Sequence, residues 1–399
     1  MPRQSKARHS VRRFAWLCLG MRCLPAVALV LLGLGAPLAA ADRAADLAAL
    51  RNVSATKAAP AEAQAAWARL AADDPAVLVD LLTAMEGADP AAQNWLRSCF
   101  DAAAERAVAA DAFPMLPLST FLYEQNNDPR ARRTAFEWIV RVDPGKKARL
   151  LEGMLEDQSL SIRYEAVAEL MQRAQSFEGS GIGDGGGEGD DAKRALYEKA
   201  LKAARNPKQI EAIADALGAL GVEVDLPGTM GFLKAWHVIG PFDNTGLEDF
   251  GTAYPPEADQ DLAAEHSGKL GEVAWQAAAA GAEDGIVDFL APLGKEKEAV
   301  AYAYTTFTAA DAGPAELRYE SKNATKVWLN GKLVASNEVY HSGGGVDQYR
   351  VGVTLKKGEN TLLVKACQNE QKMPWETEWD FRLRIVDALG SPLASQPSR

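Results

Sequence analysis

The stretch from Thr325 to Cys367 constrains the fold most, because short segments of alternating apolar and polar residues are separated there by glycine turns. Asn330-Gly331 supplies the two positive-φ residues that a two-residue hairpin turn needs. Residues 356–359 (KKGE) are expected to close a second hairpin, with Gly358 in the left-handed region. Alternation over about four to eight residues is typical of half-buried strands. The last third of the chain is therefore predicted to be antiparallel β structure.

Period-two alternation continues on both sides of this stretch. Short alternating segments about 8–12 residues apart, with polar turns between them, favour a β-sandwich or jelly roll. In the last segment Phe381 and Leu383 are expected to face the core and Arg384 to face out. We predict one β domain over residues 227–390 and a disordered tail over residues 391–399. The expected strands cover residues 299–309, 315–321, 326–330, 332–336, 348–355, 360–367 and 380–387.

Residues 42–226 show the other periodicity, with apolar residues at helical spacing in an Ala-, Leu-, Glu- and Arg-rich composition. Leu160, Tyr164, Val167 and Leu170 recur at i, i+3 and i+4, which places them on one helix face. Helix starts are indicated where an N-cap acceptor precedes a proline, since proline at the first helical position loses no needed amide donor. We expect about nine helices of roughly 10–20 residues. The indicated starts are Asp74-Pro75, Asp89-Pro90, Asp128-Pro129, Asp143-Pro144 and Asn206-Pro207.

A weak internal repeat lies within this half. NDPRARRTAFEWIV and EDQSLSIRYEAVAEL align with Arg132 over Arg163 and Ala135 over Ala166. An acidic turn, followed by an arginine and a small residue on the second helix of a hairpin, resembles HEAT-type repeats. That resemblance implies an α-solenoid in which neighbouring hairpins share a continuous core. The alternative is an irregular helical bundle without true repeats.

Residues 176–191 (SFEGSGIGDGGGEGDD) interrupt the helical pattern. Gly181, Gly183 and Gly186 match the spacing G-x-G-x-x-G, but no buried strand precedes them, so the dinucleotide-binding interpretation lacks its structural context. The acidic residues of the segment lack the spacing of a known calcium loop. Such a composition is typical of a flexible, solvated linker, which is what we predict here.

The first 41 residues have the organisation of a secretory signal peptide. Residues 1–23 are basic without any acidic residue, residues 24–38 are apolar, and small alanines follow. This order, with an A-x-A site near Ala41, predicts a cleaved signal. The apolar run is shorter than the about 20 residues that a membrane helix needs, so no membrane insertion is expected after cleavage. The mature protein is predicted to be periplasmic or secreted, with Met1 or Met21 as its start and the export route left open.

Charge and motif content exclude several classes of function. The formal net charge is −11 and becomes more negative once the basic leader is removed, so neither nucleic acid nor an anionic membrane surface is an expected partner. The sequence has no HExxH, nucleophile-elbow or P-loop motif, and its histidines are scattered, so no catalytic residue, metal or cofactor is predicted. Cys99 and Cys367 are expected to be buried thiols, with pairing as the alternative.

The segments VWLNGKLV and LKKGENTLLVKA together resemble the jelly-roll sugar-binding modules of the galactose-binding-like superfamily, such as those attached to family 2 glycoside hydrolases. WHVIGPFDN with TAYPPE is similar to the lead-in of large exported bacterial proteins that carry such modules. The resemblance covers residues 232–390. It implies a jelly-roll fold with carbohydrate as ligand, although many members of the superfamily contact a neighbouring domain and bind no sugar.

Sugar recognition needs aromatic faces for the apolar sides of pyranose rings and polar groups for the hydroxyls. The polar loop QKMPWETEWD lies between two predicted strands and offers both, with capping of the sandwich or contact with the helical half as the alternative. Residues beside the SGGGV loop are weaker candidates, which are alternatively plain turn residues. The candidate ligand-binding residues are Trp375, Trp379, Glu376 and Glu378 in the first loop, and His341, Asp347 and Tyr349 beside the second.

These observations predict a multidomain chain in which an α-helical HEAT-like repeat domain precedes an all-β sandwich of the jelly-roll type. We expect an exported, non-catalytic binding or scaffolding protein that recognises a polysaccharide or an envelope protein. One alternative is a protein–protein scaffold whose sandwich is purely structural. Another is a glycan-processing enzyme or an accessory subunit of one. The sequence leaves the ligand and the oligomeric state open.

Overall fold

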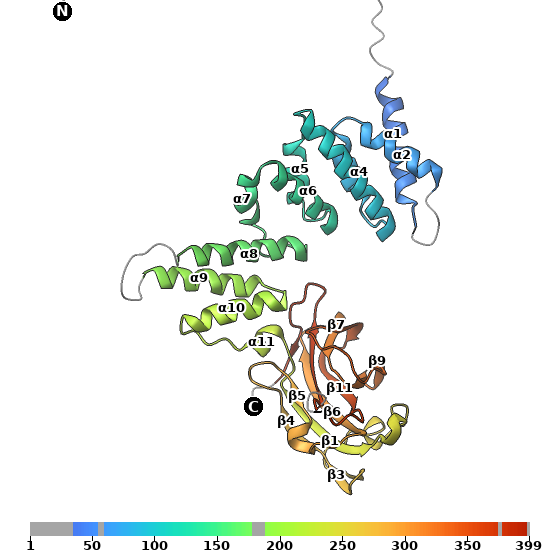
Figure 1. Cartoon of the computed structure of the whole chain (residues 1–399), viewed down its shortest axis with the longest axis vertical. Coiled ribbons are helices and arrows are strands. Elements are labelled where there is room, and N and C mark those ends of the chain that lie inside the picture. Colours follow the sequence, from blue (N-terminus) through green and yellow to red (C-terminus); the bar gives the residue numbers. More distant parts are fainter. Residues whose placement is uncertain (1–34, 55–59, 178–187, 374–376, 397–399) are drawn as a thin grey trace, which may run out of the picture.

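The computed structural model describes residues 35–54, 60–177, 188–373 and 377–396. Helices make up the structured part of the chain before Gly231, and antiparallel sheets dominate the part after it, so the prediction of a mixed fold with helices followed by β structure is confirmed. Figure 1 shows the helices following one another in a curved row, with the sheets beside the last of them. Within these ranges, no helix is both long enough and apolar enough to cross a membrane.

The helices are on average shorter than predicted. Two helices of the helical part have only five residues, and the last of that part ends at Met230, before Gly231, whose φ of 80° lies in the left-handed region. The first runs through the predicted cleavage point near Ala41. The helices of the helical part are α1 (Gly35–Arg51), α2 (Ala61–Ala72), α3 (Val77–Ala84), α4 (Pro90–Ala109), α5 (Met115–Tyr123), α6 (Pro129–Val142), α7 (Lys147–Leu151), α8 (Leu160–Ser176), α9 (Glu188–Ala203), α10 (Pro207–Ala219) and α11 (Leu226–Met230). The β part contains one more short helix, α12 (Leu290–Leu293).

Three of the five predicted helix starts are confirmed as N-caps. The side chains of Asp89, Asp128 and Asn206 each accept a hydrogen bond from a backbone N–H in the first turn of α4, α6 and α10. The other two predictions are wrong. Helix α3 begins two residues after Pro75, with Ala76 as its N-cap, and Asp143 precedes only a 3₁₀ turn. An acidic residue before proline therefore marks a turn reliably here, but not always an α-helix.

The two aligned arginines of the predicted repeat occupy equivalent positions. Arg132 in α6 and Arg163 in α8 each lie four residues after the N-cap, and both side chains are buried. Ala135 and Ala166 are also buried, at 0% and 2% exposure. Small buried side chains at these positions let neighbouring helices approach closely.

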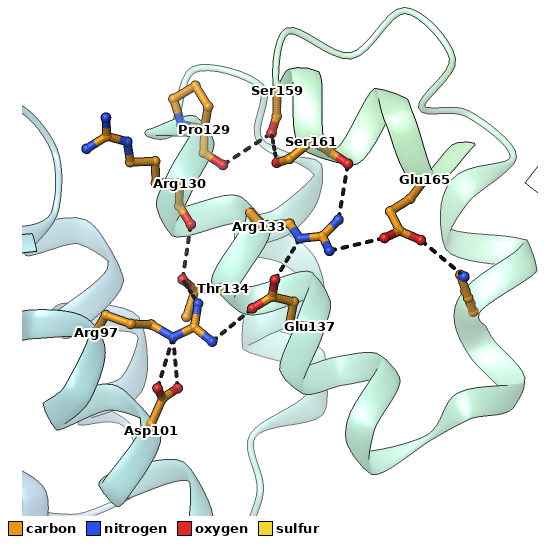
Figure 2. A network of polar contacts seen from close by, with 11 residues as sticks. Arg97, Asp101, Pro129, Arg130, Arg133, Thr134, Glu137, Ser159, Ser161 and Glu165 are labelled. Carbon is orange, nitrogen blue, oxygen red and sulfur yellow. Dashed lines mark hydrogen bonds and ion pairs between the residues drawn. The ribbon is translucent and has the colours of Figure 1, made fainter. Parts of the chain in front are cut away.

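A ladder of alternating charges links α4, α6 and α8 on one side of the helical part (Figure 2). Arg97 in α4 pairs with Glu137 in α6 at 2.8 Å and with Asp101 at 2.9 Å. Arg133 in α6 pairs with the same Glu137 at 2.8 Å and with Glu165 in α8 at 3.1 Å. Burial acts to raise the pKa of Glu137 and of Glu165, but hydrogen bonds from Arg133 and Arg97 to Glu137, and from Lys147 and Arg133 to Glu165, hold both pKa values below their ordinary range. Shared partners make this a network, which orients the three helices better than isolated surface pairs do.

Two antiparallel sheets enclose the core of the β part. All seven predicted strands are present, and the strand predicted at residues 299–309 has the same bounds in the structure. The strands are β1 (Ala235–Asp243), β2 (Glu265–Ser267), β3 (Glu272–Ala274), β4 (Gln276–Ala279), β5 (Val287–Asp288), β6 (Ala299–Ala309), β7 (Gly313–Glu320), β8 (Ala324–Leu329), β9 (Lys332–Asn337), β10 (Tyr349–Leu355), β11 (Gly358–Cys367), β12 (Asp380–Val386) and β13 (Ala394–Ser395).

The larger sheet has the strand order β4-β1-β6-β11-β8-β9, with β13 also paired to β6, and the smaller sheet has the order β10-β7-β12-β5. The inward side chains of both sheets meet in one apolar cluster, to which β11 contributes Leu362 and Val364 and β12 contributes Phe381, Leu383 and Ile385. This alternation buries one face of each strand against the other sheet. A separate short hairpin is formed by β2 and β3.

The two glycine turns of the most constraining stretch have different roles. Asn330-Gly331 closes the β8–β9 hairpin as predicted, with φ values of 52° and 77°. The prediction of a hairpin at residues 356–359 is wrong, because β10 pairs with β7 in one sheet while β11 pairs with β6 and β8 in the other. Gly358 has a φ of 85°. The side chain of Asn360 accepts from Lys356 N at 2.9 Å and donates to Lys356 O at 2.8 Å, so one buried amide holds this connection between the sheets.

Two segments predicted to be irregular are partly ordered. Helix α8 extends to Ser176 and α9 begins at Glu188, so only residues 178–187 of the predicted linker lie outside the described ranges. The prediction of a disordered tail is wrong for residues 391–396. There β13 pairs with β6, and the side-chain oxygen of Gln396 accepts from two backbone N–H groups at the start of the β part. Residues 397–399 lie outside the described part of the chain.

The two cysteines of the described residues behave as expected. Cys99 in α4 and Cys367 in β11 are free thiols, and each is fully buried. Burial raises the pKa of both thiols to about 12, so neither is a ready nucleophile. They pack as small apolar residues, and the alternative of a disulfide between them does not occur.

An ion cluster joins the helical and β parts. Arg384 in β12 points away from the sandwich core as predicted, but it is 1% exposed instead of solvated. Its Nε and Nη2 donate to the Asp347 carboxylate at 2.7 and 2.5 Å, and its Nη1 donates to the carbonyl of Met230 in α11 at 2.9 Å. Arg318 in β7 donates to the same carboxylate at 3.1 Å. The part of the smaller sheet's outer face around Arg384 is therefore covered by the end of the helical part.

Candidate functional site

Trp379, one of the four candidates in the polar loop between the two predicted strands, is not available to a ligand. Its side chain is 0% exposed, its Nε1 donates to the carbonyl of Ala366 at 3.1 Å, and its ring packs 5.5 Å from that of Phe289. The prediction of a ligand contact there is wrong, because the indole turns inward and fills the end of the core between the sheets. Trp375 and Glu376 lie outside the described residues.

Glu378 of the same loop lies at the surface in an ion pair. Its carboxylate accepts from Lys322 Nζ at 2.6 Å, with both side chains more than 40% exposed. This hydrogen bond raises the pKa of Lys322. The neighbouring Asp380 is more buried, and burial raises the pKa of its carboxyl to about 6, with Glu378 adding to the effect and Lys322 opposing it.

The three candidates beside the SGGGV loop do not form one site. Asp347 is buried and engaged by Arg384 and Arg318. Tyr349 is half-buried, with its ring 4.9 Å from that of Tyr319 on the neighbouring strand β7. His341 is exposed in the connection after β9. Asp347 lines a cavity that lies between the helical and β parts.

Lys365 is a buried amine whose hydrogen-bonding capacity is used internally. Its Nζ donates to the carbonyls of Asp249, Phe250 and Thr252 at 3.1, 3.1 and 2.6 Å and lies 3.3 Å from a carboxylate oxygen of Glu257. These contacts explain the TAYPPE segment, residues 252–257, as the loop that this ammonium fastens to the larger sheet. Burial lowers the pKa of Lys365, but its protons are committed to these acceptors. Nor do the described ranges contain a group of His, Cys, Asp or Glu side chains suited to hold a metal.

An aromatic groove opens instead on the helical part, between α2 and α4. Its volume is about 460 Å³. The groove is lined by two half-exposed tryptophans and three small polar side chains: Gln64, Trp67, Asn94, Trp95 and Ser98.

Hydrogen bonds fix one indole of this groove. Trp67 Nε1 donates to Ser98 Oγ at 3.0 Å, and Ser98 Oγ donates in turn to the carbonyl of Trp95 at 2.9 Å. Because the polar edge of Trp67 is satisfied by the protein, its ring face can take an apolar partner without leaving an unpaired donor. Among the described residues, no hydrogen bond involves the side-chain amide of Gln64 or of Asn94. Both side chains line the groove and can therefore bond with hydroxyl groups of a ligand.

Sequence reasoning missed this groove, because it searched the loops of the β part. A signal was present, since Trp67 follows buried Ala66 and Trp95 precedes buried Leu96, which places each indole at the edge of an apolar helix face. A large aromatic residue at such an edge is half-exposed by geometry. What the sequence did not provide was the contact between α2 and α4, which brings the two indoles together.

Comparisons with known proteins assign no family. No protein-family model matches the chain, and no curated protein matches it either. Among solved structures it is similar to a GH31 α-xylosidase from Xanthomonas citri, with 11% identity, 39% of this chain and 16% of that chain covered, and a TM-score of 0.20.

Two structures of a β-glucosidase from Kluyveromyces marxianus are also similar to the chain. The selenomethionine-labelled structure has 10% identity, with 72% of this chain and 35% of that chain covered and a TM-score of 0.26. The glucose complex has 12% identity, with 63% and 35% covered and the same TM-score. The chain thus spans about a third or less of the length of these enzymes, and TM-scores this low carry no argument about fold or function.

Proposed function

We propose that this chain is an exported, non-catalytic binding protein that recognises carbohydrate through the aromatic groove between α2 and α4. The observation that carries the proposal is the convergence of two half-exposed indoles with two amides and a hydroxyl on one groove. Aromatic faces cover the apolar faces of sugar rings, and amides bond with sugar hydroxyls. Both helices hold these side chains on ordered backbone, so little conformational entropy is lost when a ligand binds.

The finer architecture belongs to the same proposal. Helices of the HEAT-like type are supported by the equivalent buried positions of Arg132 and Arg163. A galactose-binding-like jelly roll is supported by two facing antiparallel sheets whose connection at Gly358 crosses between them. The β part would then act as a support, consistent with the burial of Trp379. The basic and apolar leader of residues 1–41 supports export.

Isothermal titration of the purified chain against plant, algal and bacterial envelope oligosaccharides tests the proposal. We expect saturable binding of at least one glycan. Trp95→Ala is expected to weaken that binding about tenfold or more, since a tenfold loss corresponds to about 1.4 kcal/mol and the indole supplies a stacking face.

Tyr123→Ala is the matched control, because Tyr123 is an aromatic residue of the helical part that is 52% exposed and lies outside the groove. Unchanged affinity in this variant shows that the loss is specific to the groove. If no glycan of the panel binds, carbohydrate recognition is contradicted and the protein–protein scaffold is favoured. Hydrolysis of a panel glycan by the purified chain supports the alternative function of a glycan-processing enzyme instead.

A further inference from the structure

A second cavity lies where the helical part meets the sheets. It has a volume of about 140 Å³, and its wall includes residues of α8, the start of α10, β7 and β10. Its charged lining residues are Arg163, Arg205, Arg318, Arg350 and Asp347. The whole chain is acidic, with a formal net charge of −11, so four guanidinium groups against one carboxylate depart sharply from the average surface.

An internal comparison shows what this cavity lacks. Arg132 and Arg163 occupy equivalent buried positions in α6 and α8. Arg132 forms a two-point ion pair with Asp157, at 2.8 and 2.5 Å. Arg163 donates from Nε to the carbonyl of Ala203 at 2.7 Å, and among the described residues no carboxylate lies within ion-pair distance of it. Arg132 thus has a carboxylate partner within the chain, whereas the equivalent Arg163 has none among the described residues.

Arg205 places a second guanidinium at the same cavity. Its Nε donates to Ser391 Oγ at 3.0 Å, and its Nη1 donates to the carbonyls of Lys202 and Ala204 at 2.9 and 2.8 Å. These contacts hold the side chain in place with neutral partners alone, and no ion pair of Arg205 occurs in the described part of the chain. Its charge is therefore oriented but not compensated.

The electrostatic state of Arg163 agrees with this geometry. Burial lowers the pKa of its guanidinium, and the nearby positive charge of Arg205 lowers it further. Glu156, Asp157 and Asp387 act on Arg163 only through space and in the opposite direction. A buried charge without a direct partner is costly to the folded state, so an added anion at this point is favoured.

The carboxylate already present does not meet this need. Asp347 is held by Arg384 and Arg318, so its lone pairs face the ion cluster of the β part. Arg350 lies at the rim with its side chain 60% exposed, 3.8 Å from Asp347.

We propose that this arginine-lined cavity is a binding site for a small carboxylate group, held between Arg163 and Arg205 as Asp157 is held by Arg132. The planar guanidinium fork matches a carboxylate in two-point geometry, which is the pairing that the chain itself uses one repeat earlier. Because Arg163 and Arg205 belong to the helical part while Arg318 and Arg350 belong to the β part, the cavity that holds the bound group lies between the two parts.

The test measures thermal unfolding of the purified chain with sodium acetate, sodium D-glucuronate, sodium sulfate or sodium phosphate, each against sodium chloride at equal ionic strength. Acetate and glucuronate distinguish a bare carboxylate from a sugar acid. We expect a saturable rise in unfolding temperature with carboxylates beyond that with chloride. Arg163→Met is expected to abolish this response and to raise the unfolding temperature without ligand, because it removes an uncompensated buried charge.

Two variants make the outcome decisive. Arg205→Gln, whose side chain is less buried, is expected to weaken the carboxylate response about tenfold and serves if Arg163→Met fails to fold. Arg141→Met is the control, since this arginine is 63% exposed and lies outside the cavity. A carboxylate response that is the same in the wild type and in Arg205→Gln, or none beyond chloride, overturns the site. A response to sulfate or phosphate alone overturns the assignment of carboxylate.

Trp95→Ala is expected to leave the carboxylate response unchanged, because Trp95 lies outside this cavity. This variant therefore separates the present test from the glycan test.

Discussion

Replacement of Asp347 by asparagine tests whether this residue holds the helical and β parts together. Its carboxylate accepts charge-assisted hydrogen bonds from Arg384 at 2.7 and 2.5 Å and from Arg318 at 3.1 Å, with all three side chains less than 10% exposed. Asparagine has nearly the same shape but no charge, and its amide group would present a donor to a guanidinium. The substitution leaves two buried positive charges without their shared partner.

The magnitude follows from the burial of the cluster. Removing one partner of a buried ion pair costs about 3–5 kcal/mol, because the remaining charge stays out of water. With a urea slope of about 2 kcal/mol per molar for the β part, the unfolding midpoint should fall by about 1.5–2.5 M. Burial acts to raise the pKa of Asp347, but hydrogen bonds and charges of Arg384 and Arg318 hold it below its ordinary value. The stabilisation is therefore fully present above about pH 4 and is lost only as the pH falls through the lowered pKa.

Urea unfolding at pH 7, followed by tryptophan fluorescence, measures this loss, since Trp236 and Trp379 are buried in the β core. Asp311→Asn is the matched control, because Asp311 pairs with Lys357 at 3.3 Å while both side chains are more than 70% exposed. We expect this control to leave the midpoint unchanged. A midpoint for Asp347→Asn equal to that of the control refutes the reasoning and favours the alternative from the sequence, in which Asp347 is a plain turn residue.

Three further outcomes follow from the contacts. Lys365→Met removes the donor shared by three carbonyls and should cost about 3–5 kcal/mol in urea unfolding, with faster hydrogen exchange in residues 249–257. Asp128→Ala removes the N-cap of α6 and should cost about 1 kcal/mol in thermal unfolding. Burial raises the pKa of Asp380 to about 6, so its charge opposes folding increasingly from about pH 4 to 6, and Asp380→Asn should stabilise the chain at pH 8 but not at pH 4 in urea unfolding.

Local patterns predicted the elements of this fold well. The alternation of residues 299–309 gave the bounds of β6, and Asn330-Gly331 gave a hairpin with both residues at positive φ. These features depend on neighbours in sequence, which a single chain displays directly. The choice of pairing partner for each strand could not be predicted in the same way. The turn at residues 356–359 has the residues of a hairpin turn, but it connects β10 and β11, which belong to different sheets.

The site residues were harder to predict, because their environment is set by distant segments. Trp379 has a polar sequence neighbourhood, yet its ring is buried against Phe289 of another segment. Trp67 and Trp95 form a groove only because α2 packs on α4. The alignment of Arg132 with Arg163 correctly predicted equivalent positions. It did not predict that Arg132 has a carboxylate partner while Arg163 has none among the described residues.

Titration of a glycan ligand into the double variant Trp67→Ala/Trp95→Ala tests the account most directly, because both aromatic faces of the groove are then removed while Trp379 stays in the core. Binding to the wild type should be saturable, and the double variant, with an unchanged unfolding temperature of the β part, should show none. Binding of equal affinity in both proteins contradicts recognition at this groove.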